Sequence, residues 1–507
     1  MSVIRIPLSV IKIFSVLYLL LPSLLFHFFW FRSEISVITL PGLVICYYFY
    51  SNDQFQHEKK ITSLTLKQII ILVSIALFLV IISGVGGLSY QTNDYVGHNS
   101  KFYDLFKNPW PIYFKEADTF GCYYWGFYLV PALISKMVGH LSVAAFFLWT
   151  YLGLLAGVTL AFVILGKNIY KLLLFFFLGG LGHTVKVIFG ILSGLGFEHP
   201  IVFIEVWNLL NQLLWAPNQM IPTLLIASLI YYEGISPGKN IFSCLFPLTL
   251  GFIWCVFPIV VLSFILLFNW LYFSGFKELL RLGTKIFLTK LFLPVLVCLP
   301  VLIYFLSSSG IPVRGFLWTF NPLKPIVIDY CICVLIDVLV LWGIWKYMVD
   351  YKKEVPGRFF YGLLFAIPVF GLYRFGFAND WLVRGTMPIF MMLFFIVLRG
   401  KLSFHVIRQG TTGSKILLMT LILLCLIAPF SYFYRGLKNN IFTNRMSGVQ
   451  SFEPYPYDKY PNIYQAIKQH HGLIEASQYL GNKESIYWRY LSGKSSPNYQ
   501  AGYLIRL

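Results

Sequence analysis

Apolar runs long enough to cross a lipid bilayer recur along this 507-residue chain. A hydrocarbon layer of roughly 30 Å is crossed by about 20 helical residues, and the run from Val10 to Trp30 (VIKIFSVLYLLLPSLLFHFFW) has that length. Because lipid offers no hydrogen-bond partners, such runs must form helices or closed barrels, and their continuity selects helices. Only 12% of the residues are charged, whereas a soluble domain has about 25%. The sequence therefore predicts an all-α, polytopic transmembrane protein.

The hydropathy pattern predicts about 13 spans, at approximately 10–30, 35–51, 68–88, 142–165, 171–192, 220–233, 241–253, 255–273, 286–306, 326–347, 359–373, 385–399 and 415–432. With the N-terminus in the cytoplasm, most Lys and Arg residues fall in cytoplasmic gaps, as loops retained on that side require. This topology accounts for the net charge of +19, and nucleic acid is not an expected partner.

The stretch from Cys122 to His140 has two interpretations. It is short and contains Pro131 and Lys136. As a further span it would place the GKNIYK loop (Gly166 to Lys171) outside and invert every later basic loop. We therefore predict an amphipathic helix at the outer interface, with a true span as the alternative.

Two hydrophilic parts are expected on the outer side of the membrane. The first is an outer loop, 89–141, within a transmembrane domain of residues 1–432. The second is a small extracytoplasmic tail, 433–507, whose NIYQAIKQHHGLIEASQYL stretch favours an amphipathic helix.

The outer loop carries the most informative polar residues. Asn93 and Asp94 closely follow the end of a predicted span, and His98 and Asn99 come next. An acid at the membrane surface can act as a general base or bind a divalent cation. The alternative is a solvated loop acid or the N-cap of a helix running on from Tyr95.

The order of features around Asp94 resembles that of the glycosyltransferase C superfamily, whose members use polyprenyl-phosphate sugars. The matching parts are YQTNDYVGHN (Tyr90 to Asn99), YYWGFYLVPALISKMVG (Tyr123 to Gly139), SVAAFFLWTYLGLLAGVTLAFVILG (Ser142 to Gly166) and GKNIYK. The commonest family signature has a second acid where this chain has Asn93, and many members have one span, not two, before the span of the acidic loop.

The resemblance implies an enzyme of the bacterial cytoplasmic membrane, acting at its outer face. It would move a sugar from a polyprenyl-phosphate carrier to a lipid, glycan or protein acceptor. Asp94 would deprotonate or orient the acceptor hydroxyl, and the anomeric centre would be inverted.

The negative leaving group needs cations on the outer side, where the charge develops. The candidates are Arg384, assisted by Arg374, with Arg314 on the same side. Asp380 precedes Arg384 by four residues, so on a helix the two share a face and can pair. The alternative is a structural ion pair with a snorkelling arginine.

A third outer segment, 193–222, carries carboxylates, amides and aromatic rings, a mixture suited to sugar recognition. Its candidates are Glu198, His199, Glu205, Trp207, Asn211, Trp215, Asn218 and Gln219. Glu205 is a possible partner of Asp94, as a second carboxylate or as a ligand of a divalent cation (Mg or Mn). The alternative is an interfacial aromatic belt.

Asp329 and Asp337 lie inside an apolar run. Acids within a membrane are costly and suggest function, so this pair favours a second hypothesis, a transporter or lipid flippase. Acids hydrogen-bonded to neighbouring helices are the structural alternative. A third hypothesis is a polymerase or ligase of lipid-linked glycans, which would depend on outer-loop arginines.

Overall fold

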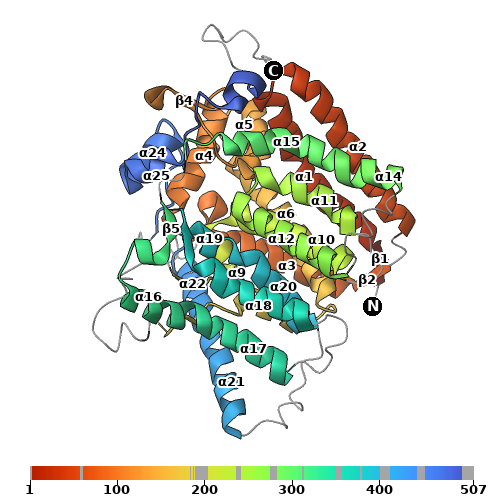
Figure 1. The fold of residues 1–507 in the computed structure, drawn as a ribbon, viewed down its shortest axis with the longest axis vertical. Helices are drawn as coiled ribbons and strands as arrows, with labels where there is room; N and C mark the ends of the chain where they lie inside the picture. The colour runs from red at the N-terminus through yellow and green to blue at the C-terminus, as the bar shows by residue number, and fades with distance from the viewer. Residues whose placement is uncertain are drawn as a thin grey trace.

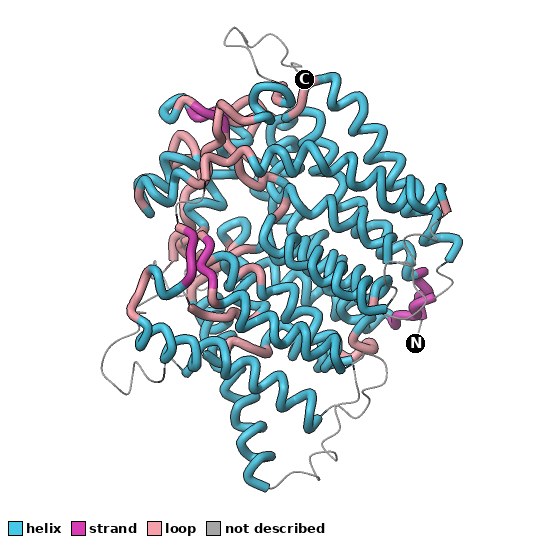
Figure 2. The backbone as a smooth tube through the Cα atoms, in the orientation of Figure 1, coloured by secondary structure: helices cyan, strands magenta, loops and turns pink. Residues whose placement is uncertain are grey.

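The chain is mostly helical, as the sequence predicts (Figures 1 and 2). The computed structural model describes residues 3–57, 61–182, 184–185, 188, 204–235, 241–273, 283–310, 313–348, 357–376, 379–399, 412–441 and 452–493. Its strands form three antiparallel pairs: β1 (Val3–Pro7) with β2 (Ile61–Thr65), β3 (Tyr113–Phe114) with β4 (Thr119–Phe120), and β5 (Arg314–Phe316) with β6 (Tyr373–Phe375).

Eight helical stretches in the described part are long and apolar enough to cross a membrane. Four are single helices or nearly so: α1 (Leu8–Trp30), α2 (Ser33–His57), α3 (Leu66–Ser83) and α6 (Val143–Ile164). The other four join consecutive helices: α14 (Thr284–Ile286) with α15 (Leu293–Leu306), α16 (Leu323–Tyr330) with α17 (Ile336–Met348), α19 (Asp380–Val383) with α20 (Thr386–Arg399), and α21 (Thr412–Cys425) with α22 (Ile427–Lys438). These eight correspond to eight of the predicted spans.

The remaining predicted spans are not among these eight stretches, so the count of 13 is not confirmed. They correspond to α7 (Ile169–Phe177), α10 (Pro217–Gly234), the region around α11 (Leu245–Leu250), α12 (Val256–Phe273) and α18 (Gly357–Gly371). The second half of the predicted 171–192 span falls largely outside the described residues. Around α11 the chain forms short 3₁₀ and α pieces. Almost every residue of α10 is buried by other protein segments.

Contacts among α1, α6 and α10 fix the direction of each helix. Lys12 forms an ion pair with Glu233, and the Tyr18 hydroxyl donates to the Trp149 carbonyl at 3.2 Å. Gly153 packs against Tyr18 and Ile221, and Gly157 packs against Leu224. Helices α6 and α10 therefore run parallel to each other, and α1 runs antiparallel to both.

The direction of α6 bears on the segment from Cys122 to His140. If α1, α2 and α3 each cross the bundle, their directions alternate, so α3 runs parallel to α1. Helix α6 runs antiparallel to α1 and therefore starts at the end where α3 finishes. No further crossing of the bundle is then needed between α3 and α6. The segment contains α5 (Gly126–Val138), 13 residues long, or about 20 Å at 1.5 Å per residue. Helix α5 thus stays at one end of the bundle. We call this the α5 end; β1 and β2 lie at the opposite end (Figure 1).

The C-terminal tail is built into the α5 end. It contains α24 (Ile463–His471) and α25 (Leu473–Ser477), separated at Gly472, whose φ of 91° favours glycine. Backbone hydrogen bonds run from Cys122 N to the Tyr479 carbonyl (2.9 Å) and from Gly481 N to the Phe120 carbonyl (2.8 Å). Another runs from Asn482 N to the Ser307 carbonyl (2.8 Å). The tail therefore joins segments that are far apart in sequence.

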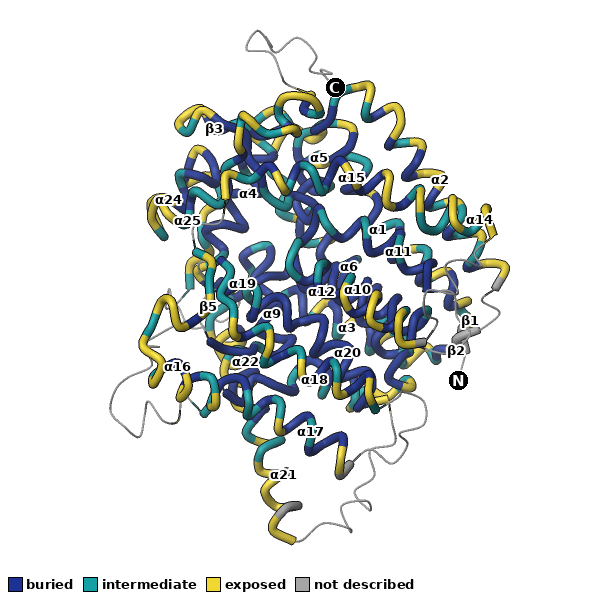
Figure 3. The backbone as a smooth tube through the Cα atoms, in the orientation of Figure 1, coloured by how far each residue is buried: buried dark blue, intermediate teal, exposed yellow. Residues whose placement is uncertain are grey.

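Burial follows the pattern of a bundle in an apolar solvent (Figure 3). Helix α20 is buried along nearly its whole length. By contrast, Val37 and Ile38 of α2 are 71% and 62% exposed. Exposed apolar side chains on long helices are expected where lipid covers the surface. The structure thus supports an integral membrane protein.

Candidate functional site

Asp94 directly precedes α4 (Tyr95–Lys107), the first helix of the outer loop. Its backbone is α-helical (φ −62°, ψ −18°), and its side chain makes no capping hydrogen bond. Asp94 is therefore not the side-chain N-cap that the structural alternative required. Its carboxylate instead faces a pocket at the α5 end.

Arg384 reaches the same pocket from the junction of α19 and α20. One terminal nitrogen, Nη2, lies 3.5 Å from Asp94 Oδ2, and Nη1 donates to Gln212 Oε1 at 2.8 Å. The guanidinium also stacks over the Trp207 ring, 4.8 Å from its centre. Three contacts on a side chain that is 7% exposed hold the cation beside the Asp94 carboxylate.

The sequence suggested that Arg384 can pair with Asp380, and the positive charge of Arg384 does stabilise the Asp380 carboxylate. Arg384 is the C-cap of α19, and its backbone N–H donates to the Asp380 carbonyl at 2.8 Å, so the four-residue helical spacing is present in the backbone. Its ion pair is with Asp94. Asp380 nevertheless lines the same pocket, as predicted for a site residue.

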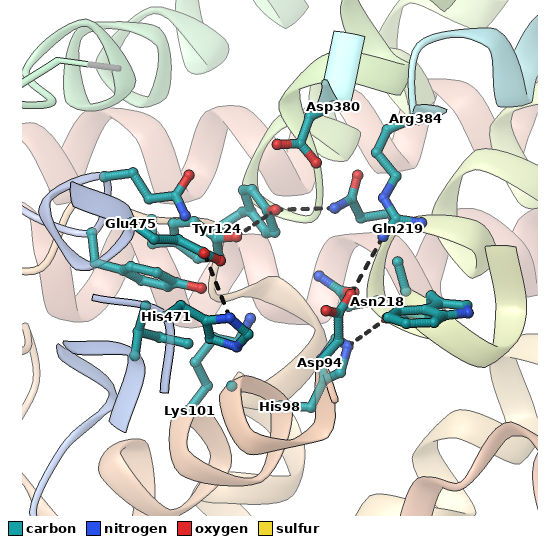
Figure 4. Close-up of a pocket in the computed structure, with 17 residues that line it drawn as sticks. Asp94, His98, Lys101, Tyr124, Asn218, Gln219, Asp380, Arg384, His471 and Glu475 are labelled. Carbon is teal, nitrogen blue, oxygen red and sulfur yellow. Dashed lines mark hydrogen bonds and ion pairs between the residues drawn. The ribbon is translucent and has the colours of Figure 1, made fainter. Parts of the chain in front are cut away.

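The pocket has a volume of about 650 Å³, counted with the open space at its mouth. Its walls come from α4, the segment before α5, the α9–α10 junction, the α19–α20 junction and the tail (Figure 4). The lining residues are Asp94, Gly97, His98, Lys101, Tyr123, Tyr124, Trp215, Ala216, Asn218, Gln219, Asp380, Arg384, Ile467, His471, Glu475, Gln478 and Tyr479.

Lys101 is a site residue that the sequence analysis missed. It is 4% exposed, and no described carboxylate lies within ion-pair distance of it. Four tyrosine rings surround its ammonium group, at 4.8 to 5.9 Å from their centres: Tyr123, Tyr124, Tyr128 and Tyr479. Burial lowers the pKa of Lys101 to about 7, against the opposing effect of Asp94. Its position seven residues after Asp94, two helical turns on, is the signal that places both on one face.

His98 lines the pocket, but both ring nitrogens are engaged. Nδ1 pairs with the Tyr128 hydroxyl, and Nε2 lies 2.9 Å from the Trp215 carbonyl. Burial holds the pKa of His98 well below its usual range, so the ring is neutral, and Nε2–H donates to Trp215. His98 therefore positions the α9–α10 junction.

Asn99 lies outside this pocket. Its amide nitrogen donates to the Tyr455 carbonyl at 2.6 Å, which ties α4 to the tail. The predicted substrate-binding role of Asn99 therefore has no support from the pocket geometry.

The α9–α10 junction supplies three of the predicted sugar-recognition residues. It joins α9 (Leu209–Trp215) to α10, and Trp215, Asn218 and Gln219 line the pocket. Gln219 Nε2 donates to the Tyr124 hydroxyl at 3.0 Å. Within the described residues, the buried oxygens Asn218 Oδ1 and Gln219 Oε1 have no hydrogen-bond donor. Both side chains can therefore accept a hydrogen bond from a ligand.

Glu205 is not a lining residue of the pocket, although Trp207 from the same segment holds Arg384. It is consequently not placed as a partner of Asp94. Glu198 and His199 lie outside the described residues.

Arg314 and Arg374 are likewise not among the lining residues. Arg314 is exposed on β5, and Arg374 lies on β6, over the Phe320 ring at 5.4 Å. The register pairs Arg374 with Gly315 in this hairpin. Arg374 therefore is not placed beside Arg384 in this pocket.

The tail contributes residues that the sequence analysis did not assign to the site. His471, Glu475, Gln478 and Tyr479 line the pocket. His471 Nδ1 lies 3.6 Å from Glu475 Oε2. Burial, with the nearby charges of Asp94 and Asp380, raises the pKa of Glu475 to about 7. The predicted amphipathic helix is present in this part of the tail, and its inner face closes the pocket.

The electrostatics of Asp94 are balanced between opposing effects. Burial raises the pKa of its carboxyl, whereas Arg384 and then Lys101 lower it. The described residues include no group of three His, Cys, Asp or Glu side chains arranged to hold a metal. The cation beside Asp94 is Arg384, so the described residues around Asp94 do not fit a resident divalent cation.

Asp337, within α17, is hydrogen-bonded to the backbone of a neighbouring segment. Its two carboxylate oxygens accept the backbone N–H groups of Leu181 and Gly182, at 3.0 and 3.2 Å. The acid therefore joins α17 to the turn after α7. Asp329 is also buried.

Comparison with protein-family models, curated proteins and solved structures gives no significant match to this chain.

Proposed function

We propose that the chain is a membrane glycosyltransferase that moves a sugar from a polyprenyl-phosphate carrier to an acceptor. One observation carries the proposal: Asp94 and Arg384, 290 residues apart in sequence, face one pocket with their charged groups 3.5 Å apart. A carboxylate can accept the acceptor's proton, and a fixed guanidinium can hold a phosphate. Both groups that the reaction requires therefore face one pocket.

In the proposed reaction, Asp94 removes the proton from an acceptor hydroxyl as its oxygen attacks the anomeric carbon. The bond from that carbon to the phosphate oxygen breaks, and the electron pair leaves with the polyprenyl phosphate. Attack occurs on the face opposite the leaving group, so the anomeric centre inverts.

Arg384 stabilises the charge that develops on the leaving phosphate. Lys101, which faces the same pocket without a carboxylate partner in the described part, adds a second cation in its protonated form. Because Arg384 contacts Asp94 through only one terminal nitrogen, an arriving phosphate can take over that contact while Gln212 and Trp207 keep the guanidinium in place. That exchange would free the carboxylate to act as a base.

The proposed location is the outer face of a bacterial cytoplasmic membrane, with the N-terminus in the cytoplasm. Lys12 pairs with Glu233 near the end of α10, and Lys290 pairs with Asp53 at 2.8 Å near the end of α2. Arg399 lies over Tyr231 at the same end, opposite the pocket. Basic residues gather on the cytoplasmic side of membrane proteins, which supports an extracytoplasmic pocket and tail.

The transporter hypothesis has less support. It depended on Asp337 as part of an ion path, but backbone N–H groups occupy both oxygens of that carboxylate. The hypothesis of a glycan polymerase or ligase depended on several outer-loop arginines, of which Arg384 lines the pocket and Arg314 and Arg374 do not.

The Asp94→Asn variant tests the proposal. Asparagine keeps the size of the side chain but cannot accept the proton, so transfer should fall by roughly 10²–10⁴-fold. Lipid-linked glycans from cells with each form of the protein would be measured by mass spectrometry. Asp118→Asn is the matched control, because Asp118 is an exposed acid in the same loop, paired with Lys483. Normal transfer by Asp94→Asn would remove the central claim.

A further inference from the structure

The C-terminal tail forms one wall of the pocket, which we call the tail wall. Glu475, Gln478 and Tyr479 bring a carboxylate, an amide and an aromatic ring to this wall, and His471 lies beside them. Glu475 Oε2 is buried and has no hydrogen bond among the described residues, since His471 is 3.6 Å away. A buried carboxylate oxygen in that state is an acceptor site for a ligand's hydroxyl groups.

Aromatic rings continue from this wall into the pocket. Tyr479 stacks on Tyr123 with ring centres 4.2 Å apart, and Tyr123 lies 3.9 Å from Tyr124. The three rings form a row, and all three line the pocket. Tyrosine rings offer apolar contact area together with a polar hydroxyl, which suits a sugar ring with its C–H faces and hydroxyl groups.

The geometry of the proposed reaction assigns this wall to one substrate. In an inverting transfer, the acceptor oxygen and the leaving phosphate lie on opposite faces of the sugar. In Figure 4, Glu475 and His471 lie on the side of the view away from Arg384 and Asn218, with Asp94 between them. If the phosphate binds Arg384, the acceptor must approach along the wall formed by the tail.

We infer that the tail wall is the acceptor subsite, and that the acceptor group is a neutral, polyhydroxylated glycan. This inference rests on the proposed function. The tail wall itself carries the carboxyl group of Glu475, whereas Asp94 and Asp380 lie nearer Arg384 (Figure 4). The Glu475 carboxyl group disfavours an anionic group such as a lipid phosphate on this side. Carboxylates beside aromatic rings instead match uncharged sugars.

The subsite is preformed because several bonds hold the tail in place. Asp104 of α4, fully buried, accepts the backbone N–H of Ile463 at 3.2 Å. The Cys122 N–H donates to the Tyr479 carbonyl, which ties Tyr479 to the segment that carries Tyr123. A wall fixed in this way binds without an ordering cost.

The test uses the full-length protein purified in detergent and an array of neutral and acidic oligosaccharides. The wild type should bind neutral glycans, and Glu475→Gln should weaken that binding by roughly tenfold or more, as expected for losing a charged hydrogen-bond acceptor. Glu484→Gln is the matched control, because Glu484 is an exposed acid of the same tail that does not line the pocket. A preference for acidic glycans, no glycan binding, or equal binding by Glu475→Gln would overturn the inference.

A kinetic arm separates this inference from the proposed function. Hydrolysis of the polyprenyl-phosphate sugar without acceptor reports donor turnover alone, and the Glu484→Gln control should leave it within about twofold. Glu475→Gln should raise the acceptor KM roughly tenfold, a larger effect than any change that it makes in donor hydrolysis. A wild type that turns over no donor contradicts the proposed function. A wild type that transfers sugar with an acceptor KM insensitive to Glu475→Gln contradicts the tail subsite alone.

Discussion

Replacing Arg384 by glutamine would remove the positive charge beside Asp94 while keeping a polar side chain of similar reach. The structure gives the size of the effect. At the observed 3.5 Å, the attraction between the two charges is about 5 kcal/mol for an effective dielectric constant near 20 and about 1 kcal/mol in bulk water. Because the Asp94 side chain is 39% exposed, we take about 2 kcal/mol, which corresponds to a pKa change of roughly 1.5.

The direction follows from the role of Asp94. Arg384 lowers the pKa of the Asp94 carboxyl, so the Arg384→Gln variant should raise it. A base works when it is deprotonated, so the acidic limb of the pH profile should move upward by roughly one to two pH units. Arg384→Gln also removes charged hydrogen-bond donors to the leaving phosphate, which should lower the transfer rate by roughly 10²–10³-fold.

The assay is the pH dependence of sugar transfer by Arg384→Gln and by Arg384→Lys. Lysine keeps the charge but cannot offer two parallel donors, so Arg384→Lys should lose rate with a much smaller shift of the acidic limb. The matched control is Arg314→Gln, because Arg314 is exposed outside the pocket. An acidic limb that stays in place in Arg384→Gln would refute the electrostatic coupling between Asp94 and Arg384.

Three further predictions follow from the contacts of single residues. Burial against α24 raises the pKa of Asp104 from its ordinary value of 3.8 to about 7. The docked state therefore favours the protonated carboxyl group, and docking of α24 should weaken as pH rises from about 4 through 7. Hydrogen exchange in α24 should show this loss, and Asp104→Asn, which still accepts the Ile463 N–H, should remove the pH dependence. Asp337→Asn should lower thermal stability by roughly 1 kcal/mol through weaker capping and leave transfer within twofold; full loss of activity in a folded variant would favour transport. Arg374→Ala should leave the KM for the sugar donor unchanged, because Arg374 does not line the pocket. A tenfold rise in that KM would show that Arg374 contributes to phosphate binding.

Some of the candidate site was accessible from the sequence and some was not. Asp94 was found because it closely follows a predicted span, and Arg384, Asp380, Trp215, Asn218 and Gln219 were found as polar groups near predicted outer ends. All six line the pocket. Lys101 was overlooked although it shares a helix face with Asp94, and Arg374 was included although it does not line the pocket.

The sequence by itself determined the class of protein and the places of eight helical stretches that are long and apolar enough to cross a membrane. Hydropathy is a local property, since each run of about 20 apolar residues must satisfy its own backbone hydrogen bonds wherever it lies in lipid. Local pattern also indicated an amphipathic helix in the tail, because its apolar residues recur at helical spacing.

Only the tertiary structure decided which polar residues meet. Asp94 and Arg384 are 290 residues apart, and the tail reaches the pocket through backbone bonds to residues near 120 and 307. No local pattern encodes such contacts, because they depend on how whole helices pack and on which buried polar atoms find partners. For the same reason, the hydropathy pattern identified Asp337 as an unusual acid within an apolar run, but only the tertiary structure showed that two backbone N–H groups donate to its carboxylate.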